Sequence, residues 1–366
     1  MSSIAKRAAD FCERFRMQVP ILLAPMAGAS APSLSIAVAR AGGLGACGAL
    51  AMSPAEILAW ACEVRAGTHG GFQLNLWVPD PAPVRDAEQE GAVRRFLAEW
   101  GPPVPADAGD ATPLEFSGQC AAILQARPAV ASSVMGLFPA EFVAQLRNAG
   151  IAWFATVTTV AEAKLAEAAG ADAIVVQGLE AGGHRGSFDA RTAESRQVGL
   201  FALLPAVVDA VRLPVIAAGG IADARGVAAA LLLGACAVHI GTAFLRCPEA
   251  RISPAWAKAL SMTLPEDTTV SRVFSGRAGR SIATAYVRAA TAPGAPSPAP
   301  YPVQRGLTAV MRQQAVKTDD VERMQAWAGQ SAALAQAVPA GTVIRALWEG
   351  AVQLLGIPWS RPDVPS

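Results

Sequence analysis

Residues 214–245 read PVIAAGGIADARGVAAALLLGACAVHIGTAFL, and this stretch decides the fold. Two short apolar segments, 214–220 and 237–243, flank a helical pattern at 222–234 that ends in glycine. A glycine fits the left-handed residue that commonly follows a helix. A strand, a helix and a second strand in this order are typical of two parallel neighbours in one sheet. We therefore expect a repeating unit of a parallel α/β fold here.

The same alternation continues over about 230 residues of the chain. Six further strand candidates lie at 19–25, 43–49, 71–77, 129–134, 151–157 and 173–178. Helical patterns separate the strands at 33–42, 53–67, 139–150, 159–170 and 200–211. Eight strands followed by helices fit a (β/α)8 barrel better than a doubly wound sheet, because no central strand is followed by a G-x-G-x-x-G turn. The sequence predicts a TIM-type barrel of the α/β class.

Two segments do not follow this repeat. Residues 79–117 are rich in proline, alanine and acidic residues, and the part after about residue 265 contains the Pro-rich stretch 292–302 followed by further helical patterns. We predict a barrel over 15–265 that carries 79–117 as a loop insertion over its C-terminal mouth. We expect residues 266–366 to form a small, mainly helical cap on the substrate side.

Composition excludes several classes of protein. Hydrophobic residues make up 52% of the 366 residues, and 30 Lys and Arg residues face 29 Asp and Glu residues, for a net charge of +1. The chain is too apolar to be disordered, and it lacks the positive excess that nucleic acid or an anionic membrane requires. Six cysteines and three histidines form no ligand spacing, which speaks against a metal site and a disulfide framework. With no long unbroken apolar run, we expect a cytoplasmic protein without a membrane partner.

The ends of the last two strand candidates carry glycines. Barrel active sites lie at the C-terminal ends of the strands, and a phosphate site commonly follows strands seven and eight. Gly219 and Gly220 end the seventh candidate, and His239, Ile240, Gly241 and Thr242 end the eighth. Glycines allow close backbone approach, and the following helix starts offer free N–H groups to an anion. The pattern indicates a cofactor phosphate, with tight turns alone as the alternative.

His184 is the candidate acid or base. It lies in the glycine-rich loop QGLEAGGHRGS, residues 177–187, directly after the sixth strand candidate. Imidazole titrates near neutral pH, and a loop of this kind lets a ligand approach. His69 precedes the third strand and so lies at the opposite face, and His239 falls within a strand, where a buried or cofactor-lining role is expected. An exposed loop histidine without chemistry is the alternative for His184.

Polar residues also occur on the third strand. Gln73 and Asn75 alternate and so share one face, where they need partners inside a barrel. A ligand with hydroxyl groups or a ring amide would supply partners, and so would the two side chains themselves or trapped water. The first strand ends in the residues Pro25, Met26 and Ala27, where the methionine either contacts a ligand or fills the core.

Several segments resemble the flavin-dependent nitronate monooxygenases, formerly called 2-nitropropane dioxygenases. The resemblance rests on PILLAPMAGASAPSLSIAVARAGGLGACGA near the start, GIAWFATVTTVAEA, VVQGLEAGGHRGSF, the stretch 214–245, and the C-terminal segments YPVQRGLT and WAGQ. It spans nearly the whole chain. Such proteins are FMN-containing barrels with a small second domain over the flavin, so the resemblance implies the same arrangement here.

The resemblance also implies roles for individual residues. FMN is expected to meet Pro25, Met26 and Ala27, with Asn75, Gln177, Gly182 and Gly183 along its ribityl chain and ring, and with Gly219, Gly220, His239, Ile240, Gly241 and Thr242 around its phosphate. His184 matches the family's catalytic histidine. Two departures stand out: the family usually carries glutamine at position 239, and Val134 and Met135 replace a more aromatic segment.

The implied reaction oxidises a nitronate with dioxygen. A nitronate is electron rich at carbon, so an oxidised flavin can accept an electron from it without any nicotinamide. His184 would remove the α-proton of a neutral nitroalkane, or hold the anionic nitronate when protonated. The expected substrates are propionate 3-nitronate or small alkyl nitronates, and the expected products are a carbonyl compound and nitrite or a related anion.

Three alternatives remain at this point. A flavin-containing, NADH-dependent enoyl-acyl-carrier-protein reductase shares the barrel and the AGGH loop. A flavin-binding protein without turnover is a second alternative. A sugar-phosphate enzyme without flavin is the third, and it would explain the glycines but not Gln73, Asn75 and Gln177 together. Tyr301 either contacts the substrate or anchors its Pro-rich loop.

Overall fold

The computed structural model describes residues 3–359. Its main sheet has eight parallel strands in the order β1-β9-β8-β6-β5-β4-β3-β2. The two outer strands meet through a parallel bridge between Leu22 and Leu44, which closes the sheet into a barrel. The strands are β1 (Ile21–Leu23), β2 (Gly45–Gly48), β3 (Phe72–Trp77), β4 (Val130–Val134), β5 (Ala152–Val157), β6 (Ala173–Gln177), β8 (Val215–Ala218) and β9 (Ala237–Ile240). All eight strands predicted from the sequence are confirmed.

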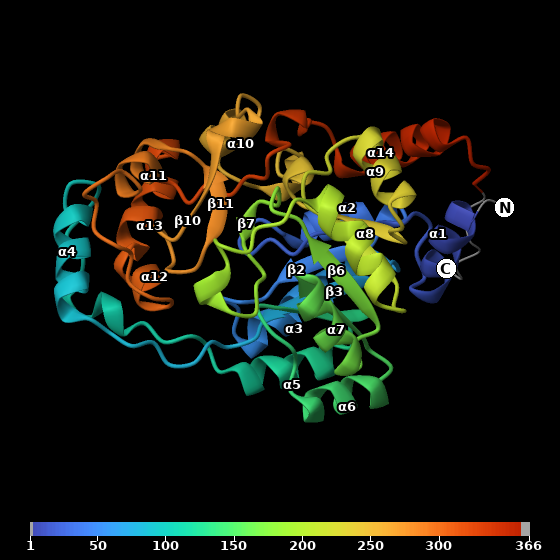
Figure 1. Ribbon diagram of the computed structural model, residues 1–366, viewed down its shortest axis with the longest axis horizontal. Helices are drawn as coiled ribbons and strands as arrows, with labels where there is room; N and C mark the ends of the chain where they lie inside the picture. The colour runs from blue at the N-terminus through green and yellow to red at the C-terminus, as the bar shows by residue number, and fades with distance from the viewer. Residues whose placement is uncertain (1–2, 360–366) are drawn as a thin grey trace.

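Helices surround the barrel (Figure 1). The ring contains α2 (Pro32–Arg40), α3 (Pro54–Gly67), α5 (Phe116–Ala126), α6 (Ala140–Asn148), α7 (Val160–Ala168), α8 (Leu200–Ala210) and α9 (Ala224–Leu232). The last helix, α14 (Ala340–Leu355), packs on α9 and α2. The predicted alternation of strands and helices is therefore confirmed, and the C-terminal helix adds a further layer over two of the ring helices.

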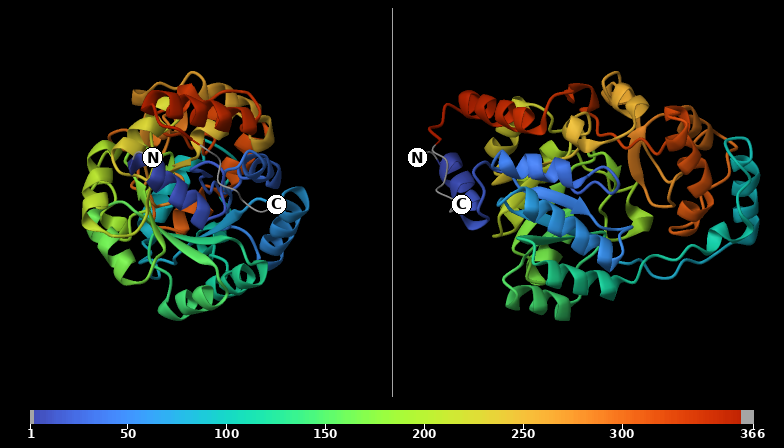
Figure 2. Two further views of the ribbon diagram at one scale, coloured as in Figure 1. Left: turned by 90° about the vertical axis from the view of Figure 1, so that its right-hand side faces the viewer. Right: turned by 180° about the vertical axis from the view of Figure 1, so that it is seen from behind.

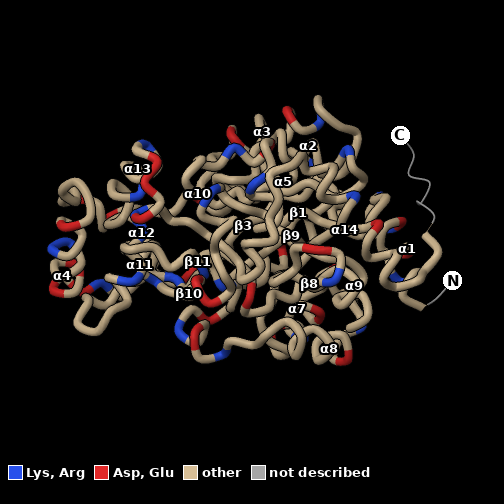
Figure 3. Tube along the Cα trace, turned by 90° about the horizontal axis from the view of Figure 1, so that it is seen from above, with Lys and Arg blue, Asp and Glu red and all other residues tan. Residues whose placement is uncertain are grey.

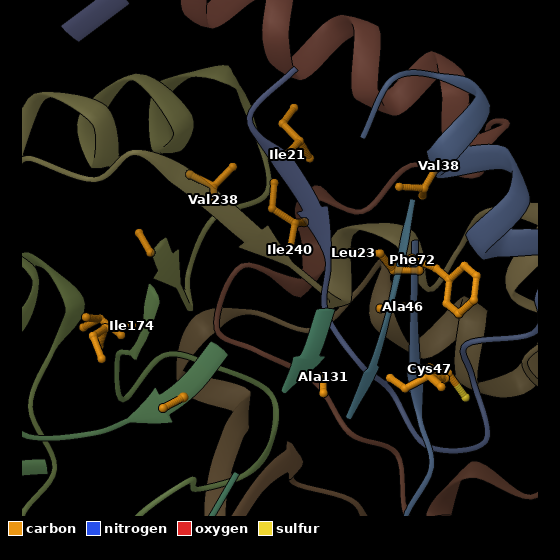
Figure 4. Close-up of a cluster of buried hydrophobic side chains, with 14 of the residues drawn as sticks. Ile21, Leu23, Val38, Ala46, Cys47, Phe72, Ala131, Ile174, Val238 and Ile240 are labelled. Carbon is orange, nitrogen blue, oxygen red and sulfur yellow. The ribbon is translucent and has the colours of Figure 1, made fainter. Parts of the chain in front are cut away.

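Side chains of the barrel strands alternate between two cores. Ile21, Leu23, Val238 and Ile240 point outward and pack with residues of the surrounding helices (Figure 4). Inward-facing residues such as Phe154 fill the N-terminal half of the barrel. Helix α1 (Ser3–Arg14) closes that end (Figure 2, left), and the ring of Phe15, just after it, lies 4.8 Å from the ring of Phe154. Because α1 closes the N-terminal end of the barrel, a ligand would bind at the opposite, C-terminal end.

A second lobe covers the C-terminal end of the barrel (Figure 1 and Figure 2, right). It combines α4 (Ala87–Leu97) from the insertion with α10 (Pro254–Leu260), α11 (Ala285–Ala290), α12 (Val303–Leu307) and α13 (Ala309–Lys317). Leu97 of α4 shares one hydrophobic cluster with Phe274, Tyr286 and Met311 from the C-terminal part. The insertion and the C-terminal segment therefore fold together as one cap.

The cap also contains a small antiparallel sheet that the sequence did not predict. Its strands are β10 (Thr268–Ser271), β11 (Gly279–Ile282) and β7 (Gly183–His184), with β11 in the middle. Gly279 pairs with His184, so the glycine-rich loop of the barrel is hydrogen-bonded into the cap. A strand of two residues has no readable periodicity, which is why sequence patterning misses it.

The boundary between two domains at residue 265 stays a prediction. Helix α14, which comes after this boundary, packs against the barrel helices α9 and α2 and not in the cap.

Positive and negative residues are mixed over both lobes (Figure 3). Across residues 3–359, none of the helices combines the length and the apolar character needed to cross a bilayer.

One local prediction concerns the start of α7. Thr159 accepts a hydrogen bond at its side-chain oxygen from the backbone N–H of Glu162, 3.1 Å away. Replacing Thr159 by alanine leaves this N–H without its cap and is expected to lower the free energy of unfolding by about 1 kcal/mol. Urea denaturation of Thr159→Ala measures this loss, and Thr159→Ser, which keeps the oxygen, is expected to restore most of it. Equal midpoints for the alanine and serine variants would contradict the capping role.

Candidate active site

A cavity of about 410 Å³ lies between the C-terminal ends of the strands and the cap. Nearly all the residues predicted for the site line it: Pro25, Met26, Ala27, Asn75, Gln177, Gly182, Gly183, His184, Gly219, Gly220, His239, Gly241 and Thr242. Ile240 does not; its side chain is buried among the aliphatic residues between strands and helices (Figure 4). The volume is within the range of roughly 300–1,000 Å³ that is usual for ligand sites.

Glycines shape two sides of this cavity. Gly219 and Gly220 have φ values of +111° and +69°, in the left-handed region that side chains disfavour. Gly182 lies so close to the C-terminal segment that an added Cβ would stand 2.5 Å from the backbone nitrogen of Gly329. That segment is also tied to the barrel by the N–H of Gly329, which donates to Thr242 Oγ1. Backbone, and not bulky side chains, therefore forms the wall where a phosphate is predicted.

Both polar side chains of β3 are hydrogen-bonded inside the barrel. Gln73 and His239 lie 2.8 Å apart through their Nε2 atoms, and Gln73 also donates to the carbonyl of Leu23. Asn75 instead donates to the carbonyl and the hydroxyl of Ser132. The two residues of β3 share one face as predicted, but each has its own partner. Burial lowers the pKa of His239 to about 4, so its ring is neutral at neutral pH.

His184 lies at the junction of barrel and cap. Its Nε2 is 2.7 Å from the hydroxyl of Ser275, and its ring packs edge-on against Trp77 and Trp327, with centroids 4.6 and 4.7 Å away. Burial, and after it the positive charges of Arg305 and other cap arginines, together lower the pKa of His184 to about 3. The imidazole is therefore neutral at neutral pH, with a lone pair on one of its two ring nitrogens.

Hydrogen bonds fix the loop that carries His184. The side chain of Gln177 donates to the carbonyl of His184 and accepts from the N–H of Gly186. Arg185 is buried and donates to the carbonyls of Gly178 and Gln177. Glu180 accepts from the N–H of Leu200 at the start of α8. The loop is therefore preorganised by its own polar residues, and Gln177 has a positioning role besides lining the cavity.

Sequence reasoning missed the residues that the cap contributes. Arg305 and Arg312 line the cavity, together with Gln325, Trp327 and Ser331. Arg305 lies within the YPVQRGLT segment and Trp327 begins WAGQ, so the resemblance marked both segments without giving these side chains a role. Val134 and Met135, the departing positions, also line the cavity. Tyr301 packs against Trp77 at the edge of the site, with ring centroids 5.3 Å apart.

The cavity lining suits an anionic ligand. It contains two arginines and no aspartate or glutamate. Two further lining residues, Gln325 and Trp256, carry buried N–H groups, Nε2 and Nε1, for which the described residues provide no acceptor. Among residues 3–359, no three His, Cys, Asp or Glu side chains group together in a way that would hold a metal ion. The site is therefore rich in donors and positive charge, which favours organic anions.

The buried side chain of His239 leads to a prediction about how stability depends on pH. The pKa of His239 in the folded protein, about 4, is below its ordinary value of 6.5, so the stability due to its neutral form is complete above pH 6.5 and is lost as pH falls toward 4. His239→Gln cannot take up a proton and is expected to flatten the fall of the melting temperature between pH 6.5 and 4. The fall is reduced and not abolished, because His184 has the same sign. The control is His69→Gln at an exposed position, and parallel curves for wild type and His239→Gln would contradict the prediction.

Known proteins share this architecture. A family model described as "Nitronate monooxygenase" matches residues 10–350. A protein of Paraburkholderia phytofirmans named nitronate monooxygenase is 40% identical over 334 residues, which cover 90% of this chain and 91% of that protein. The resemblance inferred from the motifs is thereby confirmed.

Solved structures agree with this. The nitroalkane oxidase from Streptomyces ansochromogenes is 34% identical, with a TM-score of 0.84 and coverage of 92% of this chain and 96% of that chain. FabK from Thermotoga maritima is 27% identical, with a TM-score of 0.74 and coverage of 95% and 97%. The family model and the 40% identical relative both match over most of this chain, whereas FabK is only 27% identical. This chain therefore belongs to the nitronate monooxygenase family of flavin-dependent oxidoreductases.

Proposed function

We propose that this protein binds FMN and oxidises nitronates with dioxygen. The observation that carries the proposal is a cavity lined by His184, Arg305 and Arg312 and by the glycines at 219–220, with no carboxylate side chain. A nitronate is an anion, and a neutral imidazole beside two guanidinium groups is a suitable place for one. The products would be a carbonyl compound and nitrite. Two nitronate ions and one dioxygen molecule balance two carbonyl compounds and two nitrite ions.

The residues fit FMN by their chemistry. Gly219 and Gly220, just before α9, and Gly241 and Thr242, just after β9, would hold the phosphate. Pro25–Ala27, Asn75, Gln177 and Gly182 would line the ribityl chain and the ring. When bound, the flavin supplies an electron acceptor for the substrate and passes electrons to dioxygen.

The protein's own groups would bind and orient the substrate. Arg305 and Arg312 would attract the anion, and Trp77 and Trp327 pack against the ring of His184 and orient it. With a neutral nitroalkane, the lone pair of His184 would accept the α-proton as the C–H bond breaks. Because burial and, after it, the arginines lower the pKa of His184 to about 3, the ring is a weak base. We therefore expect preformed nitronates to react faster than neutral nitroalkanes.

The two arginines favour propionate 3-nitronate among the small nitronates. This substrate carries a carboxylate as well as the nitronate group, and the guanidinium group of Arg305 has no acceptor among the described residues. A charge-assisted hydrogen bond to a carboxylate would satisfy it. Small alkyl nitronates remain substrates in this proposal, with a lower kcat/KM.

Oxygen uptake tests the proposal. The purified holoenzyme is expected to consume oxygen and form nitrite with propionate 3-nitronate in the absence of any nicotinamide. NADH alone is expected to give slow oxygen uptake at most. Rapid oxidation of NADH without nitronate turnover would instead favour the enoyl reductase alternative, and a bound flavin that neither substrate affects would favour a protein without turnover.

A further inference from the structure

Ser275 contacts the candidate base from the cap. It lies in the turn between β10 and β11, and its side chain is buried and does not line the cavity. Its hydroxyl oxygen is 2.7 Å from Nε2 of His184. A substrate in the cavity would therefore meet the histidine and not the serine, so any effect of Ser275 on proton transfer has to act through the imidazole ring.

The turn that carries Ser275 is anchored at both ends. Arg277 donates two hydrogen bonds to the carboxylate of Asp80, at 2.6 and 2.7 Å. Arg272 donates to the carboxylate of Glu194, 2.8 Å away. Asp80 belongs to the insertion, and Glu194 belongs to the segment that follows the glycine-rich loop. The hydroxyl of Ser275 therefore has a fixed position opposite the ring.

The hydroxyl of Ser275 has one proton and two possible acceptors for it. One is Nε2 of His184, and the other is the backbone carbonyl of Arg277, 3.2 Å away. Among residues 3–359 this carbonyl accepts from no other donor. Arg277 is buried, and a buried carbonyl without a donor is costly. We therefore expect the hydroxyl to donate to this carbonyl, so that Nε2 of His184 is the donor in its contact with Ser275.

The second ring nitrogen of His184 meets the cavity. Nδ1 has no hydrogen-bond partner among residues 3–359, and it is not one of the fully buried atoms that lack a partner. It is therefore accessible, and the accessible space beside His184 is the cavity. A neutral imidazole carries one N–H and one lone pair. With Nε2 as the donor, the lone pair is on Nδ1, the nitrogen that a substrate reaches.

We propose that Ser275 is a positioning residue that holds the Nε2 proton of His184 and thereby makes Nδ1 the base. This inference rests on the proposed function, since it assigns the atom that takes up the proton in that reaction. The opposite arrangement, with the serine donating to Nε2, would present an N–H and no lone pair to the cavity. His184 could then not remove a proton.

Proton transfer balances within this arrangement. The C–H bond of a nitroalkane breaks, its proton joins Nδ1, and its electron pair stays on the substrate as the nitronate. Nε2–H continues to donate to Ser275, so the hydroxyl does not have to turn as the imidazolium forms. This hydrogen bond becomes charge-assisted and therefore stronger. The serine thus stabilises the charged ring more than the neutral ring.

The variant Ser275→Ala tests the proposal on the holoenzyme. It is expected to lower kcat/KM for nitroethane by about 10- to 100-fold, the value of one hydrogen bond to a charged group. Preformed ethyl nitronate needs no proton removal and is expected to keep most of its turnover. Ser281→Ala is the matched control, because Ser281 is equally buried, lies on β11 and donates to the carbonyl of Ile282. An equal loss for both substrates in Ser275→Ala, or no loss, would overturn the proposal.

Nitrogen NMR supplies a readout that a merely structural role would not move. With isotope-labelled histidine in the oxidised holoenzyme at neutral pH, correlations to the carbon-bound ring protons show which nitrogen is protonated. The signals of His184 are those missing from His184→Asn. We expect a protonated Nε2 and a bare Nδ1 in wild type, and faster exchange of the Nε2 proton with water in Ser275→Ala. A proton on Nδ1 in wild type, or an exchange rate that the alanine leaves unchanged, would overturn the proposal.

The two readouts separate this inference from the proposed function. If the holoenzyme oxidises neither nitroethane nor ethyl nitronate, the proposed function fails, and NMR still decides which nitrogen of His184 is protonated. If nitronate is oxidised while wild type carries the proton on Nδ1, the proposed function stands and the role of Ser275 is wrong.

Discussion

Replacing His184 by asparagine is expected to lower kcat/KM for a neutral nitroalkane by about 10²- to 10⁴-fold while bound flavin is retained. The imidazole of His184 is neutral and lines the cavity at the junction of barrel and cap, whereas the other lining histidine, His239, is bonded to Gln73 within the barrel. Asparagine keeps a polar side chain of similar reach but cannot accept the α-proton. Oxygen uptake with nitroethane, at equal flavin content, measures the loss.

The same variant separates proton removal from substrate oxidation. Preformed ethyl nitronate has already lost its α-proton, so its turnover is expected to fall far less in His184→Asn. His69→Asn, at an exposed position outside the cavity, is the matched control and is expected to behave as wild type. Unchanged turnover of the neutral substrate in His184→Asn would show that His184 is not the base.

Replacing Arg305 by alanine is expected to lower kcat/KM for propionate 3-nitronate by roughly 10- to 100-fold, the value of one charge-assisted hydrogen bond. The guanidinium group lines the cavity, and its charge lowers the pKa of His184. The variant is therefore expected to shift the pKa of His184 upward as well. Steady-state kinetics with propionate 3-nitronate and propyl nitronate measure the first effect.

The comparison of substrates makes this prediction specific. Propyl nitronate carries one negative charge and propionate 3-nitronate carries two, so the dianion is expected to lose more. Arg305→Lys keeps the charge and should recover part of the loss. Arg288→Ala removes an exposed arginine elsewhere in the cap and should change neither substrate. An equal loss for both substrates would contradict a role for Arg305 in binding the carboxylate.

The barrel was predictable because each strand is an apolar run bounded by glycine, proline or charge. Residues 214–245 show this, since β8, α9 and β9 form within two or three residues of the predicted limits. His184 was also predictable, because its glycine-rich loop follows a strand end. A local pattern in the sequence was sufficient in both cases.

The remaining features depend on contacts between distant segments. Arg305 and Arg312 reach the cavity from a cap whose sheet pairs β11 with the two-residue strand β7, and no local pattern encodes that pairing. The contact of His239 with Gln73 spans 166 positions of the chain, so it appears only in the fold.

The central claim is that a nitronate alone reduces a flavin held in this cavity. The most direct test mixes the purified holoenzyme anaerobically with propionate 3-nitronate and follows the visible absorbance of the flavin, with NADH in a separate sample. The account predicts that the nitronate bleaches the flavin absorbance without any nicotinamide and that admitted air restores it. A flavin that NADH bleaches rapidly and the nitronate leaves unchanged would contradict the account.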